Sequence, residues 1–354
     1  MAQPVPREIA ERLNAAQLEA YTAYLRAFGV HSRALDGYWV AVDALRQQRR
    51  RKREASQPFS RDDYMLEQPP IYAGPPMPQD VARIIAALAP PQPETPRPDV
   101  AVFLAHARAL YGFVPERTSE REFKRRYADE ALSVGLTKTH VVRVYALETG
   151  GRGTYDMQAG IDPETKAGKP ISSALGYAQL LHANSVNELV KHGEGFISRL
   201  LAMSAVPGTA PQRVAALRAK AIVLRRMLKQ GRSVPNEWSA HVAFAGTPHG
   251  LGIHAINLDA DIGPWLQVLK LHGLLIEAQK AGRMRLSGAE IELMNLAGPR
   301  TGLEMMEPVG RAMPTSNFFS RAGYYRNTIV RGKTAAELLT AIDERMEVGL
   351  RKPG

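Results

Sequence analysis

The chain has 354 residues, and its 45% hydrophobic and 23% charged residues are ordinary for a globular protein. It lacks cysteine, which excludes disulfides and thiolate metal sites, and no apolar run approaches the roughly 18 residues that a membrane helix needs. The net charge of +11 favours polyanionic partners such as nucleic acid, anionic lipid or cell wall. The first residues do not have the basic and apolar regions of a secretory signal.

Residues 1–66 are predicted to form a helical N-terminal region. Apolar side chains recur every three or four residues between 7 and 54, which indicates a helix. That helix ends in a basic run from Arg46 to Arg53. The simplest interpretation of the run is a solvated helix end, and the alternative is a contact with nucleic acid or another anionic surface.

A proline-rich linker is predicted over residues 67–98. Ten of the 25 prolines fall between 69 and 98, which blocks regular structure except in a short apolar stretch at 81–88. Residues 99–354 are predicted to form one compact domain of mainly α class. Asp99 is a suitable N-cap for a helix over 100–111. Further helices are expected at 119–132, 138–148, 173–191, 210–230, 262–280, 288–297 and 334–348, and a hairpin is possible at 241–258.

The segment THVVRVYALETGG, residues 139–151, places a carboxyl group on an apolar helix face. Val141, Val144, Tyr145 and Glu148 follow one another at helical spacing, and two glycines then end the helix. Burial and the negative end of the helix dipole both disfavour the carboxylate anion. Glu148 is therefore a candidate general acid, and the alternative is a glutamate that turns out into solvent.

Two later segments add polar groups. The segment ISSALGYAQLL, residues 171–181, places Gly176 and Gln179 on one expected helix face, where a ligand or a second helix can approach the backbone. The segment SGAEIELMNLAG, residues 287–298, begins with the spacing of a capping box and carries Asn295 near its end. Taken alone, each of these segments is also consistent with ordinary helix packing or capping.

Together and in this order, these motifs resemble soluble lytic transglycosylases of the goose-lysozyme-like superfamily. Glu148-Thr149 corresponds to the catalytic motif, Gly176-Tyr177-Ala178-Gln179 to the Gly-Leu-Met-Gln block, and Met294 to Gly298 to the Ala-Tyr-Asn-Ala-Gly block. Tyr325, with Tyr324 beside it, corresponds to a late tyrosine. The chain departs from the family in its longer 152–170 loop, in an insertion at about 183–283, and in one extra residue between Asn295 and Ala-Gly.

The resemblance implies a lysozyme-like helical catalytic domain that cleaves the bond between N-acetylmuramic acid and N-acetylglucosamine. Glu148 would act first as acid and then as base, forming a 1,6-anhydro product without cofactor or metal. The implied substrate-binding residues are Thr149, Gly176, Tyr177, Gln179, Asn295, Tyr324 and Tyr325. Peptidoglycan strands are the implied partner, and the implied location is the periplasm or cell envelope.

Alternative functions remain open at this point. A hydrolytic muramidase would need a second acid, for which Asp156 and Asp162 are the candidates. A non-catalytic wall-binding or assembly protein is a third function, and the N-terminal helices offer a surface for a cell-envelope protein partner. Binding of nucleic acid through the basic run is disfavoured. The group of His249, His254, Asp259 and Asp261 has no recognised metal-ligand spacing, so no metal site is expected.

Overall fold

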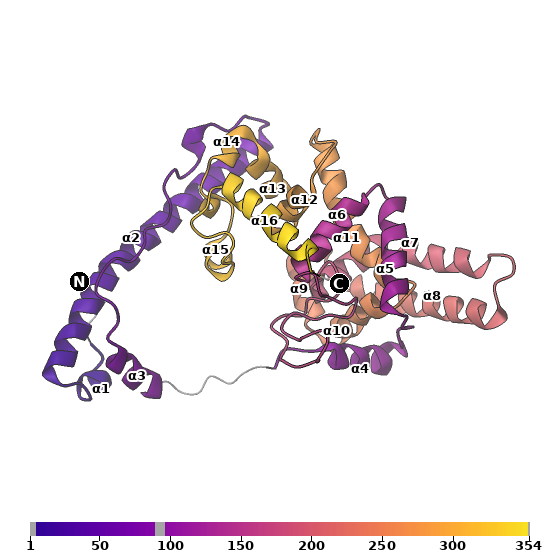
Figure 1. Cartoon of the computed structure of the whole chain (residues 1–354), viewed down its shortest axis with the longest axis horizontal. Helices are drawn as coiled ribbons and strands as arrows, with labels where there is room; N and C mark the ends of the chain where they lie inside the picture. Colours follow the sequence, from indigo (N-terminus) through magenta and orange to yellow (C-terminus); the bar gives the residue numbers. More distant parts are fainter. Residues whose placement is uncertain (1–4, 89–95, 353–354) are drawn as a thin grey trace. The chain divides into compact units, whose positions relative to one another are not determined.

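The computed structural model describes residues 5–88 and 96–352, and these residues form a mainly helical fold in which no strand is present. The chain divides into two compact units (Figure 1). The N-terminal unit contains residues 1–95 and 303–338, and the central unit contains residues 96–302 and 339–354. One boundary therefore lies close to the end of the predicted linker. Residues 303–338, predicted as part of the large domain, group with the N-terminal residues.

The N-terminal unit is organised along one long helix. Asn14 begins α2 with a capping box, its Oδ1 accepting a hydrogen bond from the backbone N–H of Gln17. The single helix predicted over residues 7–54 is therefore interrupted at 11–14. The short predicted helix inside the proline-rich segment is present as α3, and linker residues 89–95 lie outside the described residues. The unit contains α1 (Arg7–Ala10), α2 (Ala15–Glu54), η1 (Arg61–Asp63), α3 (Gln79–Leu88), α14 (Pro308–Arg311), η3 (Thr315–Asn317) and α15 (Arg321–Arg326).

Several cations of the basic run at the end of α2 form ion pairs and hydrogen bonds within the N-terminal unit. Arg49 is buried, pairs with Glu304 at 2.8 Å and donates to the backbone oxygens of Asp63 and Asn317 at 2.7 Å each. Arg53 also pairs with Glu304, and Lys52 pairs with Asp63 at 2.7 Å. These cations hold α2 against the segments around it, so the run is not the free, solvated end expected from its composition.

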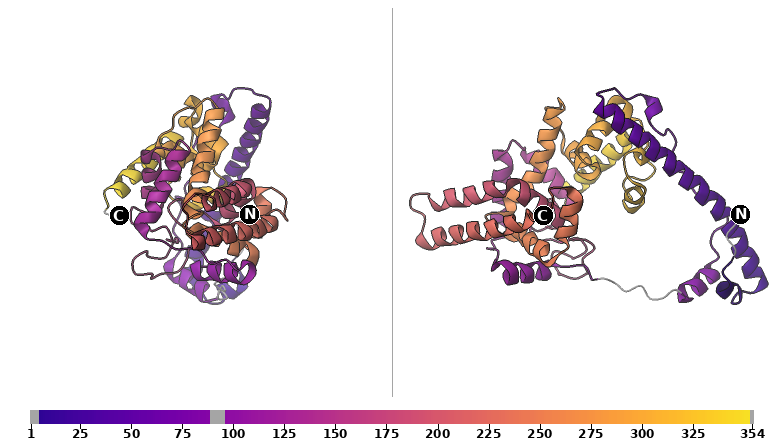
Figure 2. Two further views of the ribbon diagram at one scale, coloured as in Figure 1. Left: turned by 90° about the vertical axis from the view of Figure 1, so that its right-hand side faces the viewer. Right: turned by 180° about the vertical axis from the view of Figure 1, so that it is seen from behind.

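The central unit is built around a buried core formed mainly by α4, α7, α8, α10 and α11. Helices α7 and α8 pack against one another along their length as a helical hairpin (Figure 2). The unit contains α4 (Val100–Tyr111), α5 (Glu120–Ser133), α6 (Lys138–Glu148), α7 (His182–Ser204), α8 (Pro211–Gly231), α9 (Trp238–Ala245), α10 (Pro248–His254), η2 (Ala255–Leu258), α11 (Gly263–Lys280) and α12 (Gly288–Ala297). Helices α13 (Pro299–Met306) and α16 (Ala335–Leu350) contain the boundaries between the units.

Two predictions about local structure are wrong. The helix expected at 173–191 begins only at His182, because Leu175 and Leu180 form an antiparallel bridge around a tight turn. The expected hairpin at 241–258 is helical, since the Thr247 side chain caps α10 and Pro248 occupies its first position. By contrast, the helix predicted over 100–111 is confirmed, with Asp99 as its N-cap.

Within residues 5–88 and 96–352, no helix combines the length and the apolar character required to cross a bilayer.

Candidate functional site

Helix α6 places Glu148 at its last position, as predicted. Thr137 caps the start of α6 with its side chain, and Val141 and Val144 are buried on the inner face. The helix ends because Gly150 and Gly151 both have a positive φ, of 62° and 76°. A Cβ atom on Gly151 would lie 2.2 Å from the backbone oxygen of Gly349, so this close turn requires glycine.

The carboxyl group of Glu148 forms a hydrogen bond with a second carboxyl group, that of Glu292 on α12. Glu292 is only 4% exposed, whereas Glu148 is part-buried. Burial raises the pKa of Glu148, and burial together with the charge of Glu148 raises the pKa of Glu292 well above its ordinary value. Two such groups in direct contact cannot both ionise easily, so the pair retains a proton beyond the usual range of a glutamate.

Asn295, one turn after Glu292 on α12, holds the two carboxyl groups together. Its Nδ2 donates to Glu148 Oε1 at 3.1 Å and to the two Glu292 oxygens at 3.3 and 3.2 Å. Its Oδ1 is buried and has no hydrogen-bond partner within the described residues. A buried acceptor without a partner costs free energy, so this atom is an unpaired polar group next to the two carboxyl groups.

Two further groups lie near the carboxyl pair. The positive charge of Lys270 on α11 favours ionisation of both Glu148 and Glu292. Tyr127 on α5 is buried, its hydroxyl makes no hydrogen bond to any described residue, and burial followed by the charge of Glu148 raises its pKa. A cation and an unpaired hydroxyl therefore lie near the carboxyl pair.

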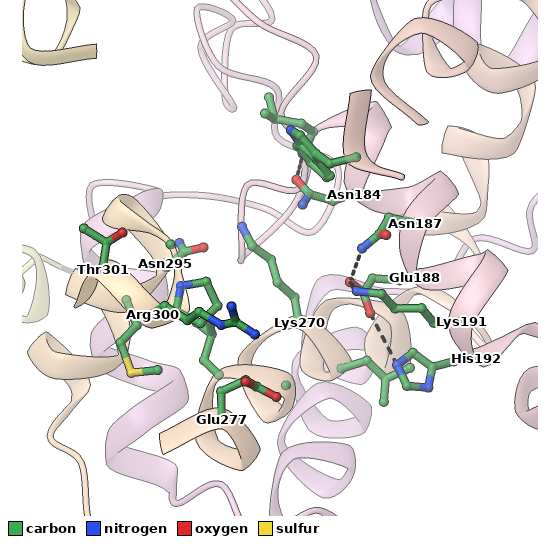
Figure 3. A pocket seen from close by; sticks show the side chains of 18 residues that line it. Asn184, Asn187, Glu188, Lys191, His192, Lys270, Glu277, Asn295, Arg300 and Thr301 are labelled. Carbon is green, nitrogen blue, oxygen red and sulfur yellow. Dashed lines mark hydrogen bonds and ion pairs between the residues drawn. The ribbon is translucent and has the colours of Figure 1, made fainter. Parts of the chain in front are cut away.

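A pocket of about 800 Å³ opens beside this group, and Lys270 and Asn295 form part of its wall. Figure 3 shows Lys270 extending between Asn295 and the pair formed by Asn187 and Glu188. The wall is rich in amides and in charges of both signs, and it includes Trp238, which is 51% exposed. The other polar residues of the wall are Asn184, Lys191, His192, Glu277, Arg300 and Thr301.

The Gly176–Gln179 segment forms a turn rather than a helix face. Gly176 has φ of 73°, and a Cβ atom on it would lie 2.3 Å from the Nε2 of Gln267 on α11. The Gln179 amide donates to the Gly176 backbone oxygen at 2.8 Å. Gln267 and Lys270 are three residues apart on α11, so the turn lies about one helical turn from the group that acts on Glu148.

The other predicted substrate-binding residues have structural contacts. Thr149 is buried, and its hydroxyl donates to the Tyr145 backbone oxygen at 2.7 Å. Tyr177 is 1% exposed and donates to Glu120. Tyr324 and Tyr325 belong to the N-terminal unit. There both rings pack against Trp39, and the Tyr324 hydroxyl accepts the backbone N–H of Gly332 at 2.8 Å.

The acids proposed from the sequence as a second carboxylate have other partners. Asp156 pairs with Arg117 at 2.6 Å. Asp162 accepts the backbone N–H groups of Glu164 and Thr165 at 3.0 and 2.7 Å, as expected of a turn residue.

The histidines and aspartates of the 249–261 region also form structural contacts. Buried His254 bonds the Ser173 backbone oxygen at 2.7 Å, and Asp259 and Asp261 pair with Lys220 at 3.0 and 2.6 Å. His249 packs on the Tyr111 ring.

Reasoning from the sequence missed Glu292, Lys270 and Tyr127. Glu292 stands three residues before Asn295, a spacing that joins side chains on one helix face, and this was the available signal. Lys270 is a lone cation in the apolar run of α11. Tyr127 follows Phe123 at helical spacing and resembles an ordinary core residue.

Comparisons with protein family models, with curated proteins and with solved structures gave no match to this chain.

Proposed function

We propose that the central unit is a peptidoglycan lytic transglycosylase and that Glu148 is its acid and base. The observation that carries the proposal is a carboxyl pair, partly removed from water, whose hydrogen-bond partner Asn295 lines a large pocket. Burial raises the pKa of Glu148, which favours its protonated form. A general acid that protonates a glycosidic oxygen requires such a proton.

The spacing of the two carboxyl groups favours a route with a single acting carboxylate. Glycosidases that use two carboxylates across the scissile bond hold them about 5–5.5 Å or 6.5–9.5 Å apart. Glu148 and Glu292 are hydrogen-bonded, so they are too close for a sugar or a water to lie between them. In the proposed route Glu148 protonates the departing oxygen and then accepts the proton of the muramoyl 6-hydroxyl, which closes the 1,6-anhydro ring.

The pocket wall suits an amide-bearing, partly anionic glycan. Asn184, Asn187 and Asn295 offer both donors and acceptors to acetamido and hydroxyl groups. Trp238 presents an exposed ring on which a sugar face can stack, and Arg300 can pair with a stem-peptide carboxylate.

The lysozyme-like assignment of the central unit is part of the same proposal. Its support is the order of elements: a helix that ends at the acid, an irregular segment with isolated antiparallel bridges, and then a helical remainder. A location in the periplasm or cell envelope follows from the substrate, and binding of a cell-envelope protein through the N-terminal helices is a further part of the proposal.

A hydrolytic muramidase is the second candidate, and the pocket contains a specific feature in its favour. Glu188 and Glu277 line the same pocket as Asn295 and Lys270 and would provide the opposing carboxylate. Under the transglycosylase proposal, replacing either by glutamine weakens binding but preserves anhydro products. Under hydrolysis, one of these replacements abolishes turnover.

The test is digestion of purified sacculi with mass analysis of the released fragments. Anhydro ends support the proposal, reducing ends support the muramidase, and binding without fragments supports a wall-binding protein. The Glu148→Gln variant should lose about 10²–10⁴-fold in rate, the range typical of a general acid. Glu290→Gln is the matched control, because Glu290 lies on α12 in an exposed capping box that glutamine preserves. Equal digestion by Glu148→Gln and its parent would refute both enzymatic functions.

A further inference from the structure

Glu292 is a buried acid that belongs to none of the motifs recognised in the sequence. It is 4% exposed, and the charges that act on it most strongly are those of Glu148 and Lys270. Removing a carboxylate from water costs several kcal/mol unless it is paired. A well-packed apolar residue at this position would destabilise the fold less, which suggests that the acid is present for its chemistry.

The charges of Glu148, Glu292 and Lys270 indicate how many protons the two carboxyl groups hold. Two carboxylates and one lysine would leave a net charge of −1 in a poorly hydrated site. With one proton shared between the carboxyl groups, Glu148, Glu292 and Lys270 together are neutral. Asn295 donates to both acids and so holds them in line, which leaves their mutual hydrogen bond as the place for the proton.

We propose that Glu292 stores the proton that Glu148 delivers to the substrate. This inference rests on the proposed function, because it assigns a positioning and proton-storing role at the same site. At rest Glu292 carries the proton and donates it in a hydrogen bond to the Glu148 carboxylate. During bond cleavage the proton moves from Glu292 to Glu148 and from Glu148 to the departing glycosidic oxygen. Glu148 then accepts the proton of the 6-hydroxyl, and its transfer to Glu292 restores the pair without another reactant.

The ionisable groups on the helices that carry and surround the pair leave this proton on the pair. Helix α5 contributes Tyr127, whose hydroxyl remains protonated because burial raises its pKa. Helix α11 contributes Lys270, whose charge balances the remaining negative charge. Arg143 of α6 is engaged by Asp343 and Glu347 of α16. Glu290 of α12 caps its own helix and pairs with Arg283.

The first measurement does not depend on substrate. Carbon NMR of the full chain with carboxyl-labelled glutamate is recorded against pH, and signals are assigned with Glu148→Gln and Glu292→Gln. We expect the Glu292 carbon to remain at its protonated position at pH 7 and the Glu148 titration to change in Glu292→Gln. Glu290→Gln should leave both titrations unchanged. If both carboxyl groups are ionised at pH 7 in the parent, the proposal is wrong, whatever the activity.

The second measurement is the pH profile of sacculus digestion. Glutamine at position 292 can still donate a hydrogen bond but cannot release a proton, so the rate near pH 7 should fall about tenfold or more. Activity should recover toward acid pH, where Glu148 itself is protonated. Glu292→Asp, which retains an acid, should restore part of the rate with the parental profile. A Glu292→Gln profile that overlays the parent overturns the inference. An inactive parent that still shows the expected titration overturns only the proposed function.

Discussion

Replacement of Glu292 by glutamine should change how stability depends on pH. The folded chain keeps a proton on the Glu148–Glu292 pair that the unfolded chain releases above the ordinary glutamate pKa of about 4.3. The contribution of the pair to stability is therefore complete at low pH. It is lost as the pH rises toward the raised pKa of the folded pair. Glutamine never ionises, so the variant does not pay this cost at position 292.

The size of the effect follows from the number of protons. A difference of one proton between the folded and unfolded states changes the free energy of unfolding by about 1.4 kcal/mol for each pH unit. The variant should therefore have nearly the parental stability at pH 4. Between pH 5 and 7 the free energy of unfolding of the variant should rise relative to that of the parent by up to about 1.4 kcal/mol per pH unit.

Urea unfolding at half-unit pH steps measures this difference. Trp39 lies in the N-terminal unit, whereas Trp238 and Trp265 lie in the central unit. A Trp39→Phe background thus makes the fluorescence report on the central unit alone. Glu290→Gln in the same background is the control, because it leaves both carboxyl groups of the pair in place. If the difference between Glu292→Gln and its parent is flat from pH 4 to 8, the pair does not hold an extra proton and the reasoning fails.

Three other predictions concern stability. Lys220→Met removes a buried cation from two buried aspartates and should destabilise the central unit by about 3–5 kcal/mol in urea unfolding, and a loss under 1 kcal/mol would contradict its structural role. Gly176→Ala adds a Cβ atom against Gln267 as well as an unfavourable φ. It should lower the melting temperature more than Gly112→Ala, which has a positive φ but open space around it, and equal shifts would show that the contact relaxes freely. Asp99→Ala removes the cap of α4 and should cost about 1 kcal/mol, with no change in sacculus digestion.

Local signals in the sequence predicted most of the helices. Asp99 and Ser287 cap their helices as their spacing indicated, and the glycine pair after Glu148 ends α6. These features depend on neighbouring residues alone, so spacing is sufficient to find them. The turn around Gly176 was missed because an apolar run of that length fits a helix as well as a bridged turn.

The candidate site was predicted only in part. Glu148 and Asn295 were both predicted as site residues, and the two side chains do meet. The spacing of Glu292 and Asn295 indicated a shared face of α12, but the roles of Glu292 and Lys270 depend on which faces of α11 and α12 meet α6. Helical periodicity identifies a face but not the helix that covers it, so contacts between segments far apart in the chain require the three-dimensional structure.

The interleaving of the two units has a consequence for the order in which the chain can assemble during synthesis. The N-terminal unit needs residues 303–338, and the central unit needs residues from 339 onward. The backbone of Gly349 lies against both Ala146 and the glycine turn after Glu148. The end of α6, where Glu148 stands, therefore gains these neighbours only after residue 349 has left the ribosome, so a shorter nascent chain cannot complete the structure around Glu148.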